Sequence, residues 1–257
     1  MNNSCLETYR LDVNIGECLV CRRLNLNVHY GRMLAILGRN GVGKSTLLAT
    51  LAGLRPPAGG DIRLDQRKLV DYPVRELARR RGCMLQEGID GLGATVLQTA
   101  LIGRHPHLGR WDWEHQSDIA LARAALDDVG LAGLEHRSTN SLSGGERQRL
   151  AYAAVLTQSP GLYLLDEPLA HLDLKHQVSL MQRCTRLARQ EGACVLVVLH
   201  QPGFALRYCD EVLLLYGEGR SENGPVSNLL NAERLSELYD YPMRHSGEGE
   251  SAWFAPA

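Results

Sequence analysis

The sequence has no excess of positive charge. Its 257 residues carry 28 Lys and Arg against 29 Asp and Glu, which gives a net charge of −1. Nucleic-acid binding needs a basic excess or stripe, so this balance argues against a nucleic-acid partner. Internal repeats and low-complexity stretches are also missing, and the length suffices for a sizeable core without disulfides or metals.

The sequence also lacks a long apolar run. The apolar runs, such as Val195–Leu199 and Val212–Tyr216, fall far short of the roughly 18–20 residues that span a bilayer. The first residues, MNNSCLETYRLD, have no basic start followed by an apolar block, so they do not resemble a signal peptide. We therefore expect a cytosolic protein, which can still dock on a membrane partner.

Paired cysteine motifs are scarce. The seven cysteines are odd in number and widely scattered, which argues against a disulfide framework. Cys18 and Cys21 form one CxxC pair without a second pair at zinc spacing. Ordinary reduced thiols are the favoured interpretation, and a zinc site is the alternative.

Strand and helix signals alternate along the chain, which predicts an α/β fold with a mostly parallel sheet. Short apolar runs of the kind buried in parallel sheets occur at Met33–Leu37, Cys83–Leu85, Leu162–Leu165 and Val195–Leu199. A helix is expected at Lys44–Leu54, where Pro56 and Pro57 stop it, and the Gly59-Gly60 turn leads into a strand at Asp61–Leu64.

The middle of the chain has few strand signals. Apolar spacing predicts helices at Asp118–Val129 and Ser143–Gln158. We therefore expect one domain over residues 1–257, in which 1–86 and 159–245 form the core and 87–158 form a helical insertion. The Gly- and Glu-rich residues 246–257 are expected to be a frayed tail.

The strongest motif follows the first buried strand and matches the phosphate-binding pattern GxxxxGK[ST]. Its glycines let backbone N–H groups surround phosphate oxygens, and the next helix offers its positive end to the same anion. Lys44 supplies a charge to the phosphates, and the Ser45 hydroxyl can bind Mg²⁺. A chance glycine turn is the alternative, but the strand before it and the helix after it favour nucleotide binding. The predicted nucleotide-binding residues are Gly38, Arg39, Asn40, Gly41, Val42, Gly43, Lys44, Ser45 and Thr46.

Two carboxylates, Asp166 and Glu167, follow the strand at Leu162–Leu165. The carboxyl ends of parallel strands are where such sheets bind ligands. Asp166 can orient Mg²⁺, and Glu167 is placed to polarise the attacking water. Alone, the pair would suggest a solvated turn; together with the phosphate loop it predicts a hydrolytic site.

A second candidate phosphate site lies at Ser143, Gly144, Gly145 and Glu146. Ser143 and Glu146 form a capping box that starts a helix. A capping box does not require two glycines in the first turn, where they cost helix stability. The glycines indicate a backbone that lies close to a bulky anion.

The segment LSGGERQR, Leu142–Arg149, resembles the signature motif of ATP-binding cassette (ABC) ATPases. Other short segments resemble that family's motifs in the expected order: Gln86 the Q-loop glutamine, Ala170–Asp173 the D-loop, and His200 the switch histidine. The resemblance covers about Leu6 to Met243.

The resemblance implies a P-loop NTPase (RecA-like) core, an N-terminal antiparallel β subdomain and an inserted α-helical subdomain. It implies a head-to-tail homodimer or paired cassette, in which ATP lies between the phosphate loop of one subunit and the signature helix of the other. Glu167 would be the general base and His200 would hold the γ-phosphate and the water. Gln86, Ser45 and Asp166 would contact Mg²⁺, and Gln86 would link the site to the helical insertion.

Three segments resemble the ATPases of ferric-siderophore, haem and cobalamin importers: Ile102–His107, Leu165–Gln177 and Glu237–Pro242. Gly109–Glu114 favours a cobalamin type. A polytopic permease would dock on the helical subdomain at 87–110, with an external substrate-binding protein contacting the permease. The chain would then lie peripherally on the cytoplasmic side of the inner membrane. His105 and His107 could instead suggest a metal pair, but a third ligand is lacking nearby.

The sequence departs from the family at two places. Ile15 occupies the position of the usual adenine-stacking aromatic, and Tyr9 is the nearest aromatic candidate. Leu169 and Ala170 replace the usual Thr-Ser. The alternatives are an iron–sulfur assembly ATPase and a non-hydrolysing binding module; intact Lys44 and Glu167 argue against the latter. The transported substrate is chosen by proteins outside this chain.

Overall fold

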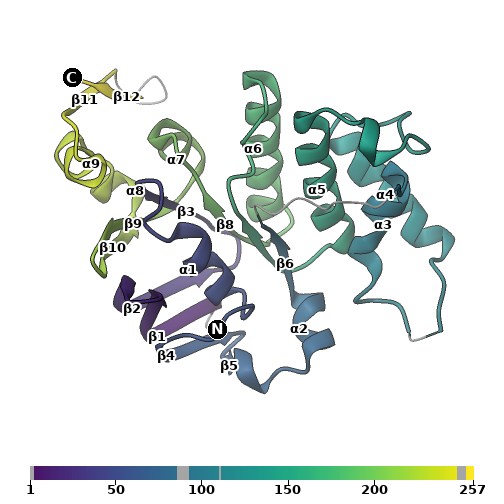
Figure 1. The fold of residues 1–257 in the computed structure, drawn as a ribbon, viewed down its shortest axis with the longest axis horizontal. Coiled ribbons are helices and arrows are strands. Elements are labelled where there is room, and N and C mark those ends of the chain that lie inside the picture. Colours follow the sequence, from purple (N-terminus) through teal and green to yellow (C-terminus); the bar gives the residue numbers. More distant parts are fainter. Residues whose placement is uncertain (1–2, 86–92, 110, 248–252) are drawn as a thin grey trace.

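The computed structural model describes residues 3–85, 93–109, 111–247 and 253–257. In these ranges a six-stranded sheet has the order β10-β9-β3-β8-β7-β6 (Figure 1). Neighbouring strands run parallel except β10, which is antiparallel to β9. The strands are β3 (Met33–Gly38), β6 (Arg81–Met84), β7 (Leu162–Leu165), β8 (Cys194–Val198), β9 (Glu211–Gly217) and β10 (Arg220–Pro225).

Both faces of this sheet are covered, which explains its continuous apolar strands. Every residue of β3 is buried. Because side chains alternate along a strand, Leu34 and Ile36 belong to one core cluster while Met33, Ala35 and Leu37 belong to the other. The predicted mostly parallel sheet is confirmed.

The Leu34 face packs against α1 (Lys44–Leu51) and a four-stranded sheet of order β2-β1-β4-β5. That second sheet is antiparallel throughout, which confirms the expected N-terminal β subdomain. Helix α1 ends three residues earlier than predicted, since Gly53 adopts a left-handed φ of 69°. The remaining elements here are β1 (Ser4–Ile15), β2 (Cys18–His29), β4 (Gly59–Leu64), β5 (Arg67–Lys68), the 3₁₀ turn η1 (Leu69–Asp71) and α2 (Val74–Arg80).

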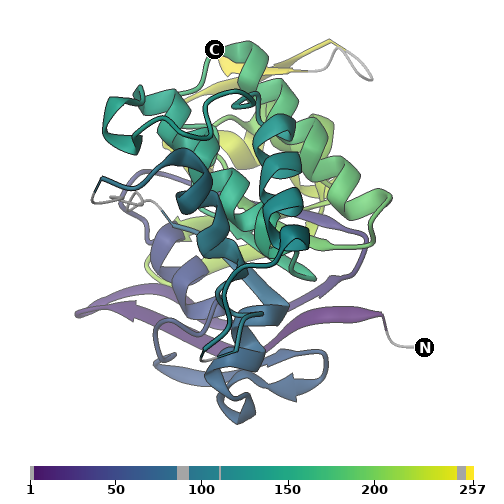
Figure 2. The ribbon, with the colours of Figure 1, turned by 90° about the vertical axis from the view of Figure 1, so that its right-hand side faces the viewer.

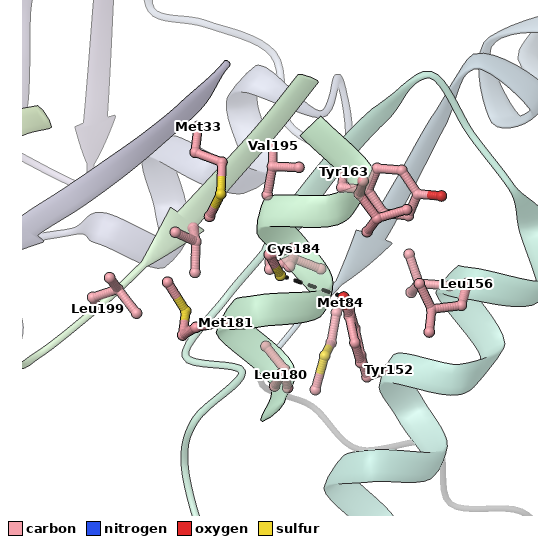
Figure 3. Packing of buried hydrophobic residues seen from close by; sticks show 14 of the residues in the cluster. Met33, Met84, Tyr152, Leu156, Tyr163, Leu180, Met181, Cys184, Val195 and Leu199 are labelled. Atoms are coloured by element: carbon pink, nitrogen blue, oxygen red, sulfur yellow. Dashed lines mark hydrogen bonds between the residues drawn. The ribbon is translucent and has the colours of Figure 1, made fainter. Parts of the chain in front are cut away.

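The Met33 face packs against α6 (Leu174–Arg189) and α7 (Pro202–Tyr208). Figure 3 shows Met33 and Val195 from the sheet meeting Met181 and Cys184 of α6. Tyr152 approaches from the neighbouring helix, and its hydroxyl lies 3.3 Å from the Cys184 sulfur. This hydrogen bond satisfies the one polar atom of a fully buried ring.

The predicted helical insertion contains α3 (Val96–Leu101), η2 (Ile102–Arg104), α4 (Gln116–Asp128), η3 (Thr139–Ser141) and α5 (Gly144–Gln158). Figure 2 views the molecule from this side. In the described part of 87–158, extended pairing is limited to an isolated bridge between Thr95 and Ser138. Both predicted helices are present, with starts and ends within two residues of the prediction.

The prediction of a frayed tail is wrong for the residues that the structure describes. After α8 (Val226–Leu229) and α9 (Ala232–Tyr239), strands β11 (Met243–Ser246) and β12 (Trp253–Pro256) pair as an antiparallel hairpin. Phe254 packs against the main core, and its ring centroid lies 5.1 Å from that of His245. Phe254 therefore packs the hairpin of β11 and β12 against the core, although the surrounding sequence is mostly polar.

Cys18 and Cys21 lie in different environments on β2. Cys21 is buried on β2 with its thiol directed at the Leu11 carbonyl, whereas Cys18 is exposed. Across the described ranges, no three His, Cys, Asp or Glu side chains gather as metal ligands. Likewise, no helix in the described part of the chain is both long and apolar enough to cross a bilayer.

Candidate nucleotide-binding and hydrolytic site

Three adjacent parallel strands deliver the predicted site residues to one edge of the sheet. Strand β3 lies next to β8, and β8 lies next to β7. The phosphate loop follows β3, His200 follows β8, and Asp166 with Glu167 follows β7. Residues far apart in sequence therefore meet because their strands end side by side.

The phosphate loop depends on two of its glycines. Gly41 and Gly43 have positive φ values of 78° and 101°, a region that side chains other than glycine rarely adopt. A Cβ at Gly43 would also lie 2.5 Å from Val20 Cγ2. Gly43 is the N-cap of α1, so the free N–H groups of the first turn of that helix lie next to the phosphate loop.

Lys44 is the buried cation of the loop. Its Nζ donates hydrogen bonds of 3.0 Å to the carbonyl oxygens of Gly38 and Arg39, and the residue is only 5% exposed. Burial lowers the pKa of Lys44, and the carboxylates of Glu167 and Asp166 oppose that effect. The amine is thus held in the loop by neutral acceptors, which an anionic phosphate would replace.

Asp166 is a buried carboxylate without a full set of partners. Neither oxygen is in a hydrogen bond of normal geometry with a described residue, although the residue is 2% exposed. Burial raises the pKa of Asp166, and the neighbouring Ser45 hydroxyl opposes the increase. An orphaned carboxylate beside a hydroxyl is the oxygen donor set that Mg²⁺ prefers.

Glu167 and His200 form a direct pair. The Nε2 atom of His200 lies 2.8 Å from Oε1 of Glu167. Glu167 has a left-handed φ of 47°, and its carbonyl accepts a 3.0 Å hydrogen bond from the Gln148 side chain on α5. The strained backbone and this contact together fix where the carboxylate points.

Lys44, Glu167 and His200 line one cavity of about 360 Å³, and Asp166 is not among its lining residues. It is lined by Ile15, Asn40, Gly41, Gly43, Lys44, Ser45, Thr46, Glu167 and His200. Ile15 therefore lines the cavity, in agreement with the position that the family resemblance gave it. Tyr9 lies elsewhere on β1, with the Arg63 guanidinium 5.0 Å from its ring, so it does not replace the missing aromatic.

The signature residues lie outside this cavity. Ser143 caps α5 by accepting from the Glu146 N–H at 3.2 Å, and Glu146 accepts from the Ser143 N–H at 2.7 Å. A Cβ at Gly145 would lie 2.9 Å from the His171 carbonyl, whereas at Gly144 the nearest atom is 3.8 Å away. The close His171 carbonyl explains why position 145 is a glycine. Only Gly144 remains without a packing reason, so only Gly144 still points to a bulky anion near the backbone.

Comparison with known proteins decides the family. The sequence profile described as "ABC transporter" matches residues 21–170, more than half of the chain. The chain belongs to the ABC transporter family. The matched family and its relatives identify it as an ATP-binding ATPase, as predicted.

Curated relatives of this ABC ATPase are named hemin import ATP-binding protein HmuV. The protein from Rhodopseudomonas palustris is 37% identical over 229 residues, covering 86% of this chain and 82% of the relative. That from Streptomyces coelicolor is 40% identical over 235 residues, covering 91% and 82%.

Solved structures agree with this assignment of the ABC ATPase. A metal-chelate type ABC transporter in an inward-facing conformation has a TM-score of 0.86 and 31% identity, covering 99% of this chain and 98% of that one. A dimeric ATP-binding cassette bound to ADP and phosphate after hydrolysis has a TM-score of 0.72 and 27% identity, covering 84% and 97%.

The segment Ile102–His107 of this ABC ATPase ties its helices together. A Cβ at Gly103 would lie 2.1 Å from the Ala154 carbonyl of α5, so glycine is required. Arg104 Nε donates to Asp118 at 2.8 Å, and its Nη1 reaches the carbonyls of Thr157 and Gln158 at 3.2 and 3.4 Å.

His107 continues the same set of contacts. Its Nε2 lies 3.0 Å from the Gln158 carbonyl, and burial lowers its pKa. The Pro106 carbonyl accepts from Arg75 at 3.1 Å and from Arg79 at 2.6 Å, both on α2. Pro106 and His107 are therefore part of a structural junction between α5 and α2, whereas the His105 side chain is exposed.

Two residues near the site were missed at the sequence level. The Tyr239 hydroxyl donates a 3.4 Å hydrogen bond to the His200 carbonyl, and Asp240 forms a 3.3 Å ion pair with Arg39 of the phosphate loop. Sequence reasoning noted the surrounding segment only as a subfamily resemblance. Gln86, the predicted Q-loop residue, lies outside the described residues.

Proposed function

We propose that this ABC ATPase is the ATP-hydrolysing subunit of an importer for haem or a related metal chelate. The observation that carries the hydrolytic part is the Glu167–His200 pair, which lies on the same cavity as Lys44. The relatives named for hemin import support haem, in place of the cobalamin type that Gly109–Glu114 favoured. They also support import over an iron–sulfur assembly role.

In the proposed reaction, Lys44 exchanges its carbonyl acceptors for the phosphate oxygens of ATP. Glu167 accepts a proton from a water molecule as that water attacks the γ-phosphorus. The bond between the γ-phosphorus and the bridging oxygen breaks, and ADP leaves with phosphate. His200, already 2.8 Å from Glu167, would orient the carboxylate and contact the γ-phosphate.

Ser45 and Asp166 fit a Mg²⁺ ion, because Asp166 is a buried carboxylate without hydrogen bonds of normal geometry from described residues. Gln86 would be a third contact by family resemblance. The ion would supply positive charge to the β- and γ-phosphate oxygens. The chain's own part is to hold these oxygen donors at the end of β7 and the start of α1.

The location of Ser143–Glu146 outside the cavity supports a head-to-tail dimer. One chain presents a phosphate loop and, separately, a capped helix N-terminus with a glycine at 144 that is not needed for packing. A second copy would bring its signature helix over the first copy's ATP. The related cassette seen as a dimer with ADP and phosphate supports this arrangement.

The permease would dock where the helical subdomain, 87–158, meets the core formed by 1–86 and 159–245. A cavity of about 250 Å³ lies at this junction, between the end of β6 and helix α5. Ile102, 40% exposed, lies on it together with Leu85 and Pro106. The chain would thus sit on the cytoplasmic side of the inner membrane, with the external binding protein contacting the permease alone.

The substitution Glu167→Gln tests the proposed hydrolysis. The amide keeps the shape but cannot accept the proton, and general-base catalysis contributes roughly 10²–10⁴ in rate. We expect ATPase activity to fall by that factor while ATP with Mg²⁺ still binds, so that the variant accumulates as a dimer in size exclusion. Glu233→Gln, an exposed position on α9, is the matched control.

Two results would contradict this proposal. A Glu167→Gln protein that hydrolyses ATP at the parent rate excludes Glu167 as the base. A variant that binds ATP but stays monomeric excludes the ATP-sandwich dimer. Uptake of labelled haem, cobalamin and ferric siderophore, with the permease that co-purifies, then identifies the cargo.

A further inference from the structure

The turn that ends α9 contacts two parts of the nucleotide site, the His200 segment after β8 and the phosphate loop after β3. Tyr239 is the last residue of α9, and Asp240 caps it in the left-handed conformation with φ of 53°. The Tyr239 hydroxyl contacts the His200 main chain, and the Asp240 carboxylate contacts Arg39. Two neighbouring residues thus bridge the end of β8 and the loop after β3.

The His200 segment has few other supports. Before it, the Leu199 N–H donates to Ile36 at 3.1 Å; after it, the Phe204 N–H donates to Gln201 at 3.2 Å. Tyr239 supplies the one side-chain hydrogen bond to the His200 carbonyl found among the described residues. Burial raises the pKa of Tyr239 to about 12, so its hydroxyl stays protonated and able to donate at neutral pH.

The C-terminal hairpin holds this turn in place. The Met243 N–H donates to the Ser236 hydroxyl of α9 at 2.8 Å, and the Ala257 N–H donates to the Pro242 carbonyl at 2.8 Å. Strand β12 packs on α7, the helix that begins two residues after His200. Figure 1 shows this hairpin at the end of the molecule opposite the helical subdomain. The hairpin therefore contacts both α9, which ends at Tyr239, and α7, which begins shortly after His200.

We infer that Tyr239 is a positioning residue of the ATPase site, which holds His200 in place for its contact with Glu167, and that Asp240 fixes the same turn to the phosphate loop through Arg39. This inference rests on the proposed hydrolytic function. The Arg39–Asp240 pair is exposed, so it contributes little stability of its own and acts by orientation. The Tyr239 hydroxyl does not line the cavity, so its effect reaches ATP only through His200.

The experiment compares Tyr239→Phe with Tyr72→Phe in the full-length chain. Tyr72 is a matched control, because its hydroxyl also donates to a main-chain carbonyl, that of Leu64 at 2.8 Å, away from the site. Each variant loses one hydrogen bond, so we expect similar falls in Tm. Tyr239→Phe alone should lower kcat by about two- to tenfold, with KM for ATP unchanged.

A second measurement does not depend on activity. The imidazole NMR signals of His200, identified with a His200→Gln variant, should shift in Tyr239→Phe and stay in place in Tyr72→Phe. Equal kcat values in the two variants, or unshifted His200 signals, would overturn the inference. If the parent does not hydrolyse ATP, the proposed function fails, and the His200 signals alone decide whether Tyr239 positions this residue.

Discussion

Loss of the buried Arg104–Asp118 ion pair should destabilise the protein measurably. The side chains are 13% and 7% exposed, and Arg104 also donates to two carbonyls at the end of α5. Arg104→Ala would leave Asp118 without its cation and the Thr157 carbonyl without the Arg104 donor, while the Gln158 carbonyl keeps its contact with His107. Asp118 keeps its hydrogen bond from the His115 backbone N–H, so we take a cost of about 2–3 kcal/mol from the range for charged hydrogen bonds.

For a chain of this length that cost corresponds to a fall in Tm of about 4–12 °C. The assay is thermal unfolding at pH 7, with Lys68→Ala as control. Lys68 pairs with Asp61 at 3.0 Å, but their side chains are 42% and 46% exposed. Loss of this exposed ion pair should lower the free energy of unfolding by less than about 1 kcal/mol. Equal Tm values for the two variants would refute the claim that the junction of α4 and α5 depends on Arg104.

The same pair gives a pH dependence with a defined sign. The His115 backbone N–H and then Arg104 lower the pKa of Asp118 below its ordinary value of 3.8. A lowered pKa in the folded state adds stability above the unfolded pKa, and the gain disappears as pH falls through the folded value. The stability difference between the parent and Arg104→Ala should therefore narrow below about pH 4. A difference that widens in acid would show the reasoning to be wrong.

Three further outcomes are expected. Lys44→Ala should abolish the rise in Tm that ATP with Mg²⁺ gives the parent, because the loop loses its buried cation; an unchanged rise would exclude Lys44 as a phosphate ligand. Gly103→Ala should lower Tm by several degrees, because its Cβ would lie 2.1 Å from the Ala154 carbonyl; the matched control is Gly203→Ala, whose Cβ would meet nothing within 4 Å and whose φ, like that of Gly103, is not left-handed. Phe254→Ala should increase hydrogen exchange of the β11–β12 amides and leave those of β8 protected.

Much of the site was predictable because its motifs are local. The phosphate loop needs glycines, a lysine and a serine within eight residues, and the structure places them around one cavity. Glu167 was found because it follows a buried apolar strand together with Asp166, a pattern visible without knowing the strand order, whereas His200 was assigned only by its resemblance to the family's switch histidine. The same reasoning gave the two helices of the insertion within two residues.

What was missed depends on contacts between distant segments. No local pattern reveals that Tyr239 reaches His200, or that Gly145 is pressed against His171. The hairpin of β11 and β12 was hidden by the polar composition around it. The segment Ile102–His107 suggested a subfamily, and His105 with His107 suggested a metal pair as an alternative, whereas Pro106 contacts arginines of α2 and His107 contacts a carbonyl of α5.

The Gln158 side chain attaches one end of α5 to the core and leaves the other end able to move farther. Its side-chain amide donates to the carbonyls of Ala78 and Arg81, so the carboxyl end of this helix is attached to the core directly before β6. The helix is 15 residues long, and its other end carries Ser143. A turn of about 10° around Gln158 would move that far end by about 4 Å over a helix of roughly 22 Å, while the attached end stays still. A small change at the core could thus become a larger displacement of the signature residues.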